Sequence, residues 1–358
     1  MRKLIPLTVP DLGPEEEEAV LAVMRSGMLV QGPRVAAFES AVAKAASRKY
    51  GVAVSSGTAA LTLSLQVLGV GPGDEVLVPA MSWPSPAHAI ACLGATPVLV
   101  DVHPGEWNAP AAGYRDGLTA RTKAAIVIDQ FGNPARGDEI SEALGGVPIV
   151  EDAACAIGSR FAGGAPCGSL GGLSTFSFHP RKVLTTGEGG VVVTDNEDFF
   201  QRLKVLRNHG QSSSGVFVEA GVNLRLTEIA GAMGEIQVSR LEELLKARRT
   251  RAEQIRAALE PALTFQAIPP GALANYQTLG ALLPRGEAPE EFITKARARG
   301  VQVGRLSYDL GAIGSLAPRA MPNADECVRR GVALPLYATM SDEEVGKVIE
   351  VLGTVRSM

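Results

Sequence analysis

The stretch "TFSFHPRKVLTTGEGGVVVTD", residues 175–195, places a lysine between two apolar segments. The segments at 173–178 and 189–195 are short, apolar and separated by proline and glycines, which predicts two strands joined by a tight loop. Such a loop gives Lys182 no packing role. Taken alone, a loop lysine is most often a solvated surface residue. A chemical role for Lys182 therefore requires partners elsewhere in the chain.

Five more apolar segments precede this pair, and helical segments alternate with them. They are nearly continuous apolar runs, which is typical of strands buried on both faces of a mostly parallel sheet covered by helices. Polar loops follow several of them, at the strand ends where open α/β sheets bind ligands. The predicted strands lie at 51–54, 74–79, 96–102, 123–129 and 147–152.

The last third of the chain has a different pattern. A long charged helical segment over 226–259 precedes a Pro/Gly cluster at 269–271. Beyond it, alternating short strands and helices predict a small α+β domain. We therefore expect a large domain over 1–245 and a small domain over 246–358. The later segments are strands at 276–284 and 301–307 and helices at 288–300 and 341–353.

Composition excludes several classes of protein. The 358 residues are 46% hydrophobic and 20% charged, with a net charge of −4 and no basic tract, so we expect no nucleic-acid partner. No apolar run is long enough for a membrane span, and no secretory signal is evident. The four cysteines lack CxxC spacing and the four histidines form no cluster, which predicts reduced thiols in a cytoplasm and no metal site.

The alternative role for Lys182 is an amine that attacks an aldehyde cofactor. Pyridoxal phosphate is such a cofactor, and it needs three further groups in a protein. A carboxylate keeps its ring nitrogen protonated. Backbone N–H groups and hydroxyls at a helix N-terminus hold its phosphate. A flat side chain covers its ring.

Each of these groups has a candidate at the end of a predicted strand. Taken singly, each has a commoner explanation: a helix cap, a core tryptophan or an ordinary strand serine. Their joint order along the chain is poorly explained by coincidence. The candidates are Ser56, Gly57 and Thr58 for the phosphate, Trp83 for the ring, Asp152 for the ring nitrogen and Ser177 as a further phosphate donor.

At this point the sequence resembles a known family, the DegT/DnrJ/EryC1/StrS aminotransferases. The resemblance is close over about 5–245 and looser beyond. It implies the aspartate-aminotransferase fold (fold type I) and pyridoxal 5'-phosphate as cofactor. The matching motifs are "SGTAAL", "GPGDEVLVPAMSW", "VEDAACAIGS", "GSLGGLSTFSFHPRKVLTTGEGGVVVTD", "LRNHGQ" and "GVNLRLTEIAGAMG".

The resemblance also implies roles for single residues. Lys182 would hold the cofactor covalently and carry the proton, and Asp152 would pair with the pyridine nitrogen. Trp83 would stack on the ring, while Gly57, Thr58 and Ser177 would bind the phosphate. The same resemblance implies transfer of an amino group from L-glutamate or glutamine to a keto sugar linked to a nucleotide.

Other implied roles involve a second subunit or the substrate. Asn223 matches an asparagine that reaches the phosphate of the neighbouring subunit, which implies a homodimer with shared active sites. Arg225 matches a candidate for the donor carboxylate. Glu188 and His209 would lie near the substrate, although a structural hydrogen-bonding role for His209 is the simpler interpretation.

The sequence departs from the family pattern in two places. Cys155 stands where a glutamine usually touches the phenolic oxygen of the cofactor, and Ile157 replaces a polar residue. An inert buried thiol is the simpler interpretation of Cys155, and a redox role is the alternative. The segment "LSYDLGAIG", 306–314, lacks the histidine of the family segment that lines the acceptor pocket, so the acceptor pocket cannot be carried over.

Three alternatives remain beside the sugar aminotransferase. The first is an aminotransferase for a cyclitol ketone or another small ketone. The second is a sugar dehydratase of the same fold, against which Lys182 argues because such enzymes replace the lysine. The third is a non-catalytic regulatory protein of this fold. A nicotinamide-dependent enzyme is not expected, because no GxGxxG follows a first strand.

Overall fold

A seven-stranded sheet organises the chain in the computed structural model, which describes residues 4–260, 262–313 and 320–355. Only β8 runs antiparallel to its neighbours, so the predicted, mostly parallel sheet is confirmed. In spatial order the strands are β1 (Tyr50–Val54), β8 (Gly190–Thr194), β7 (Leu173–Ser177), β6 (Ile149–Asp152), β5 (Thr122–Ile128), β2 (Glu75–Pro79) and β4 (Thr96–Val100).

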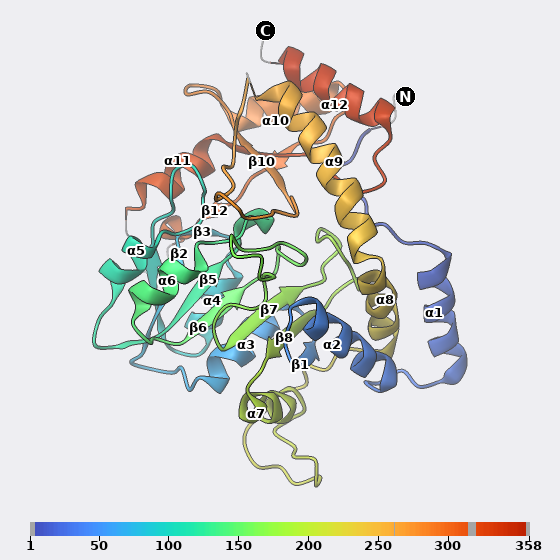
Figure 1. Cartoon of the computed structure of the whole chain (residues 1–358), viewed down its shortest axis with the longest axis vertical. Coiled ribbons are helices and arrows are strands. Elements are labelled where there is room, and N and C mark those ends of the chain that lie inside the picture. The colour runs from blue at the N-terminus through green and yellow to red at the C-terminus, as the bar shows by residue number, and fades with distance from the viewer. Residues whose placement is uncertain (1–3, 261, 314–319, 356–358) are drawn as a thin grey trace.

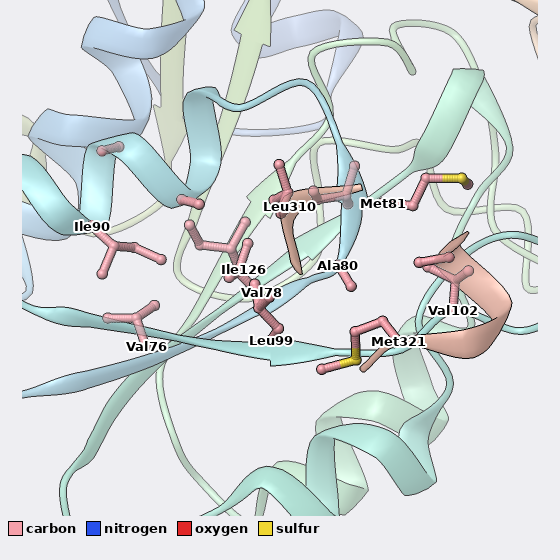
Figure 2. Packing of buried hydrophobic residues seen from close by; sticks show 14 of the residues in the cluster. Val76, Val78, Ala80, Met81, Ile90, Leu99, Val102, Ile126, Leu310 and Met321 are labelled. Carbon is pink, nitrogen blue, oxygen red and sulfur yellow. The ribbon is translucent and has the colours of Figure 1, made fainter. Parts of the chain in front are cut away.

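Both faces of this sheet are buried, which explains the continuous apolar strands. In β2, Val76 and Val78 join one core cluster, whereas the intervening Leu77 joins a cluster on the opposite face. Successive side chains of a strand point to opposite faces, so a strand covered on both sides must be apolar at every position. Figure 2 shows the first cluster, in which Ile126 and Leu99 pack beside the β2 valines.

Helices cover the two faces of the sheet. One face packs on α3 (Gly57–Val67) and α4 (Ser85–Cys92), and α7 (Glu197–Arg207) packs beside α3. The opposite face packs on the three helices α2 (Pro33–Ala45), α5 (Ala111–Gly117) and α6 (Gly137–Leu144). Helix α8 (Glu228–Ser239) packs against both α2 and α1 (Pro14–Ser26), as Figure 1 shows.

The predicted single helix over 226–259 is wrong, because two helices occupy it. The first is α8, and Arg240 separates it from α9 (Leu241–Leu259). The Arg240 guanidinium binds both Asp11 and Glu16, which fixes the junction against the N-terminal segment. Charge and periodicity do not reveal such a break, since Arg240 itself is a good helix former.

The C-terminal third forms a four-stranded antiparallel sheet with helices, which fits the expected α+β arrangement but has more strands than the two predicted. The strand expected at 301–307 is only two residues long, because only Gly304 and Arg305 pair with β13. In order, the strands are β11 (Gly304–Arg305), β13 (Gly331–Leu334), β10 (Leu279–Leu282) and β9 (Thr264–Phe265). The helices are α10 (Pro289–Ala298), α11 (Pro322–Arg330) and α12 (Asp342–Val355).

Helix α9 belongs to two cores. Its Leu244 and Leu245 pack in the core of the large sheet, whereas Ile255 and Leu259 pack with α12 in the C-terminal core. In Figure 1 this helix runs from α8 to the C-terminal layer. The boundary at 245/246 remains a prediction. No helix within the described ranges combines the length and the apolar character that crossing a membrane requires.

Candidate active site

The predicted site residues gather at one edge of the large sheet. In this sheet Val54 pairs with Gly190, and Gly190 pairs with Ser177, so β1 and β7 end at the same edge with β8 between them. The strands β2, β5 and β6 are parallel to β7, so their carboxyl ends reach the same edge. This edge is the place where open α/β sheets bind ligands.

The segment after β1 forms a cradle at the N-terminus of α3. The Ser56 hydroxyl caps the helix by accepting a hydrogen bond from the Ala59 N–H at 3.2 Å, and the exposed Thr58 hydroxyl lies 2.8 Å from the Ser85 hydroxyl. A Cβ atom at Gly57 would lie 2.8 Å from Ser177 Cβ and 3.2 Å from its Oγ. The cradle therefore combines helix N–H groups, hydroxyls and an approach that only glycine permits, and it suits a phosphate.

Replacing Gly57 by alanine is expected to weaken cofactor binding at least about tenfold, because the added methyl group would displace Ser177. Equilibrium titration with pyridoxal phosphate, followed by absorbance, measures the effect. Gly71→Ala is the matched control, since a Cβ atom there meets nothing within 4 Å. Equal affinities of the two variants would contradict the assignment of Gly57 to the phosphate site.

Lys182 lies in the loop between β7 and β8, with its amine directed at Cys155. Its Nζ donates a hydrogen bond to Cys155 Sγ at 3.1 Å, and its backbone N–H bonds to the carbonyl of His179 at 2.8 Å. Both side chains are half-buried. The sequence interpretation of Cys155 as a buried thiol is therefore wrong: the residue lies half-buried in the turn after β6, with its sulfur beside the Lys182 amine.

Asp152 ends β6, close enough to Lys182 for their charges to interact. Burial raises the pKa of the Asp152 carboxyl above its usual value, while the Ala154 N–H and the Lys182 charge act to lower it. One carboxylate oxygen accepts a hydrogen bond from that N–H at 3.1 Å. Among the described residues no other hydrogen bond to this carboxylate is found, so the group suits a protonated ring nitrogen.

Trp83 is exposed at the mouth of the site, which overturns the alternative of a core tryptophan. It is 60% exposed and packs edge-to-face on Tyr308, with ring centroids 5.2 Å apart and planes at 83°. The two-residue strands β3 (Met81–Ser82) and β12 (Tyr308–Asp309) pair and hold the rings together. The predicted acceptor segment 306–314 therefore lies beside Trp83 through Tyr308. Its last residue, Gly314, lies outside the described residues.

The predicted substrate residues lie on two neighbouring segments. The Leu224 carbonyl accepts a hydrogen bond from Ser55, which places Asn223 and Arg225 beside the phosphate cradle. The Asn223 side chain is exposed, and the Arg225 guanidinium donates to the Asn208 side chain. His209 has a left-handed backbone (φ 59°) and bonds through its N–H to Val222, which fits a structural role.

Glu188 has the least structural support among the predicted substrate residues. Its carboxylate is largely exposed and lies 4.0 Å from the His179 imidazole. Within the described part of the chain, no hydrogen bond joins Glu188, His209 or Arg225 to Lys182. The structure therefore brings Lys182, Cys155 and Asp152 into one cluster and leaves the substrate residues at its periphery.

Sequence reasoning missed two buried residues that hold the site together. The Asn275 side-chain amide donates to the carbonyls of Cys155 and Ile157, both at 2.9 Å. The Gln277 amide donates to the Arg181 carbonyl at 2.7 Å. Segment 275–277 therefore anchors the turn that carries Cys155 and the loop that carries Lys182. The one sign of this anchoring role in the sequence is the polar pattern Asn-x-Gln before an apolar strand.

A second cluster that sequence reasoning missed lies on the face of the large sheet that packs on α2, α5 and α6. Ligand atoms of the fully buried Asp129, Glu151 and Cys167 lie within 4.8 Å of one another. The Glu151 carboxylate already accepts hydrogen bonds from two backbone N–H groups and from Ser174. Burial and the Glu151 charge raise the pKa of Asp129, and burial raises that of the Cys167 thiol. The Glu151 oxygens already have protein hydrogen-bond donors, and the absence of a metal site stays our prediction.

Comparison with protein families gives one match that spans most of the chain. Residues 10–353 match the model of the DegT/DnrJ/EryC1/StrS aminotransferase family. The match includes every residue assigned above to the cradle, the lysine loop and the segment around Asn223.

Solved structures agree with this match. The aminotransferase TlmJ from Streptoalloteichus hindustanus is 31% identical over 99% of both chains, with a TM-score of 0.94. Spr1654 from Streptococcus pneumoniae, described as a sugar aminotransferase and solved in its PMP and PLP forms, is 27% identical over 99% of this chain and 98% (PMP form) or 99% (PLP form) of that one, with a TM-score of 0.93. DesV from S. venezuelae is 28% identical over 98% of both chains, with a TM-score of 0.92.

Proposed function

The chain belongs to the DegT/DnrJ/EryC1/StrS aminotransferase family and is a pyridoxal-phosphate-dependent aminotransferase of that fold, and we propose that it aminates a nucleotide-linked 3-keto or 4-keto deoxysugar with L-glutamate or glutamine as donor. The observation that carries the proposal is the amine of Lys182 in one cluster with the Asp152 carboxyl, beside a phosphate cradle at the sheet edge.

The residues of the cluster divide the chemistry between them. When bound, pyridoxal phosphate supplies a protonated ring that accepts the electrons of the broken C–H bond of the donor. Asp152, whose carboxylate accepts a hydrogen bond from the Ala154 N–H, would keep the ring nitrogen protonated. Lys182 would hold the cofactor, and its amine, once released, would take the α-proton from the donor and, in the second half of the reaction, deliver a proton to the acceptor carbon that receives the amino group.

The remaining residues would orient the cofactor and substrates. Gly57, Thr58 and Ser177 would bind the phosphate, and Trp83, which packs edge-to-face on Tyr308, would cover the ring. Cys155 would face the phenolic oxygen as a weak thiol partner in place of glutamine. Arg225 is the candidate for the donor carboxylate, because its guanidinium lies half-buried beside the cradle.

We propose that the active enzyme is a homodimer in which Asn223 reaches the phosphate of the other subunit. Apolar side chains near Asn223 support this proposal, because an apolar surface patch marks a contact with another protein. The exposed residues are Val216, Phe217, Val218 and Val222, and a second group lies at Met28, Leu29 and Val30. Sedimentation of the purified protein tests the assembly, and a monomer at micromolar concentration would contradict it.

The exposed ring of Tyr308 supports a sugar acceptor, because aromatic faces bind the apolar faces of sugars and bases. Replacing Tyr308 by alanine is expected to raise the KM for the acceptor about tenfold, which corresponds to about 1.4 kcal/mol, and to leave the reaction with glutamate unchanged. Steady-state kinetics with varied acceptor measures the change. Tyr308→Phe retains the ring and should behave like the unchanged enzyme. A larger effect on the glutamate reaction would refute this role.

A cyclitol or another small ketone remains the alternative acceptor, since it needs the same amine chemistry. The dehydratase alternative is disfavoured by Lys182, and family membership sets aside the non-catalytic one. A panel of keto sugars with and without a nucleotide, compared with a cyclitol ketone, separates the two acceptor classes. Turnover with the cyclitol ketone alone would contradict the proposal that the acceptor is a keto sugar.

The donor is tested by absorbance of the purified enzyme with pyridoxal phosphate. L-Glutamate or L-glutamine should convert the yellow lysine-bound form to the pyridoxamine form, and an added keto sugar should restore it. An absorbance spectrum that neither amino acid changes would contradict the proposed donors while leaving the family assignment intact.

A further inference from the structure

The contact between Cys155 and Lys182 has a chemistry that the proposed mechanism does not use. The 3.1 Å between Nζ and Sγ places a nucleophilic amine against a half-buried sulfur. The other three cysteines differ. Cys167 and Cys327 are buried, and burial raises the pKa of both thiols, that of Cys327 to about 12. Cys92 is exposed, and among the described residues no hydrogen bond joins it to a lysine amine.

The fold holds this pair together. Asn275 is fully buried and binds the carbonyl of Cys155, while the buried Gln277 binds the carbonyl of Arg181, next to Lys182. The Gln277 N–H donates to the Asn275 side chain at 2.8 Å, which joins the two anchors. The backbones of the cysteine turn and the lysine loop are thus fixed by the same buried segment. With both backbones held, the Cys155 sulfur and the Lys182 nitrogen can move apart only by rotation of their side chains.

We propose that Cys155 and Lys182 form a modification site at which hydrogen peroxide cross-links the cofactor-free enzyme. Peroxide oxidises the Cys155 thiol to the sulfenic acid and is itself reduced to water. The nitrogen of Lys182 then attacks the sulfur through its lone pair, an S–N bond forms, and the sulfenic oxygen leaves as a second water. The net change is the loss of one hydrogen from sulfur and one from nitrogen. Two equivalents of a thiol reverse it and become a disulfide.

This inference rests on the proposed function, because its consequence depends on Lys182 as the residue that holds the cofactor. A nitrogen bonded to Cys155 cannot attack the cofactor aldehyde, so the cross-link blocks cofactor attachment. Bound cofactor in turn occupies the amine and protects the pair. The glutamine of the family pattern has no thiol, so this chemistry is a property of the chain that carries Cys155.

The test treats cofactor-free protein with hydrogen peroxide and follows it by mass spectrometry of tryptic peptides. The expected product joins the peptides that contain Cys155 and Lys182, with the loss of two hydrogen atoms. Dithiothreitol should restore both the free peptides and the uptake of pyridoxal phosphate, measured by absorbance. Cys155→Ser should abolish the cross-link. Cys92→Ser, the matched control at the exposed thiol, should retain it.

Two results would overturn the proposal. One is a loss of two hydrogens that maps to a disulfide between cysteines or persists in Cys155→Ser. The other is Cys155 oxidised without a bond to Lys182. The readout is independent of turnover. A protein that cross-links but never binds pyridoxal phosphate refutes the proposed function alone, whereas one that reacts with glutamate but never cross-links refutes this inference alone.

Discussion

Replacing Lys182 by alanine is expected to lower the rate of amino transfer roughly 10⁴-fold or more, because both covalent attachment and proton transfer are lost. The yellow absorbance of the lysine-bound cofactor should disappear even with pyridoxal phosphate in excess. The Asp152 carboxyl and the phosphate cradle remain, so the variant should still bind the cofactor without a covalent bond. Initial rates with glutamate and an acceptor, together with the absorbance spectrum, measure both effects.

Two further variants separate the amine from its charge and from general surface effects. Lys182→Arg keeps a positive charge near Asp152 but not a nucleophilic amine, and it should be as inactive as the alanine variant. Lys204→Ala removes a lysine of α7 that packs over Phe200, and it should retain activity. Activity in Lys182→Arg would show that charge alone suffices, and it would contradict the assigned role.

Replacing Asp152 by asparagine is expected to lower kcat about 10²–10³-fold while leaving covalent attachment at Lys182 intact. The amide has the same shape, and its oxygen still accepts the Ala154 N–H, but it cannot keep a ring nitrogen protonated. Single-turnover absorbance with glutamate separates attachment from the proton-transfer step. The exposed Asp138→Asn is the control, and equal rates for the two variants would exclude Asp152 from the mechanism.

The same substitution should stabilise the cofactor-free protein at high pH. Burial raises the folded-state pKa of Asp152 above its unfolded value, so ionisation of this group costs stability as the pH rises. Below the unfolded pKa of about 3.9 the carboxyl is protonated in both states and the cost vanishes. The Tm of Asp152→Asn should therefore exceed that of the unchanged protein at pH 8, and the gap should shrink towards pH 4. A gap that grows as the pH falls would contradict this sign.

The local sequence predicted the large sheet well, because both faces of its strands are buried and the apolar signal is therefore continuous. Every strand predicted between residues 51 and 195 is present in the structure with small changes at its ends. The junction at Arg240 was missed because ion pairs to Asp11 and Glu16, more than 200 residues away, fix it. The strand at 301–307 was overpredicted, since an apolar run does not reveal how many residues find a partner.

The sequence by itself determined the family, the cofactor and the order of the candidate residues, because these depend on residue types at short spacings along the chain. Tertiary structure alone decided how those residues meet. It turned Trp83 outwards against Tyr308, 225 positions later, and it brought Cys155 to the amine of Lys182. It also places the buried Asn275 and Gln277 where their amides hold the Cys155 turn and the Lys182 loop. The physical reason is that such contacts join segments that only packing brings together, and local spacing carries no record of them.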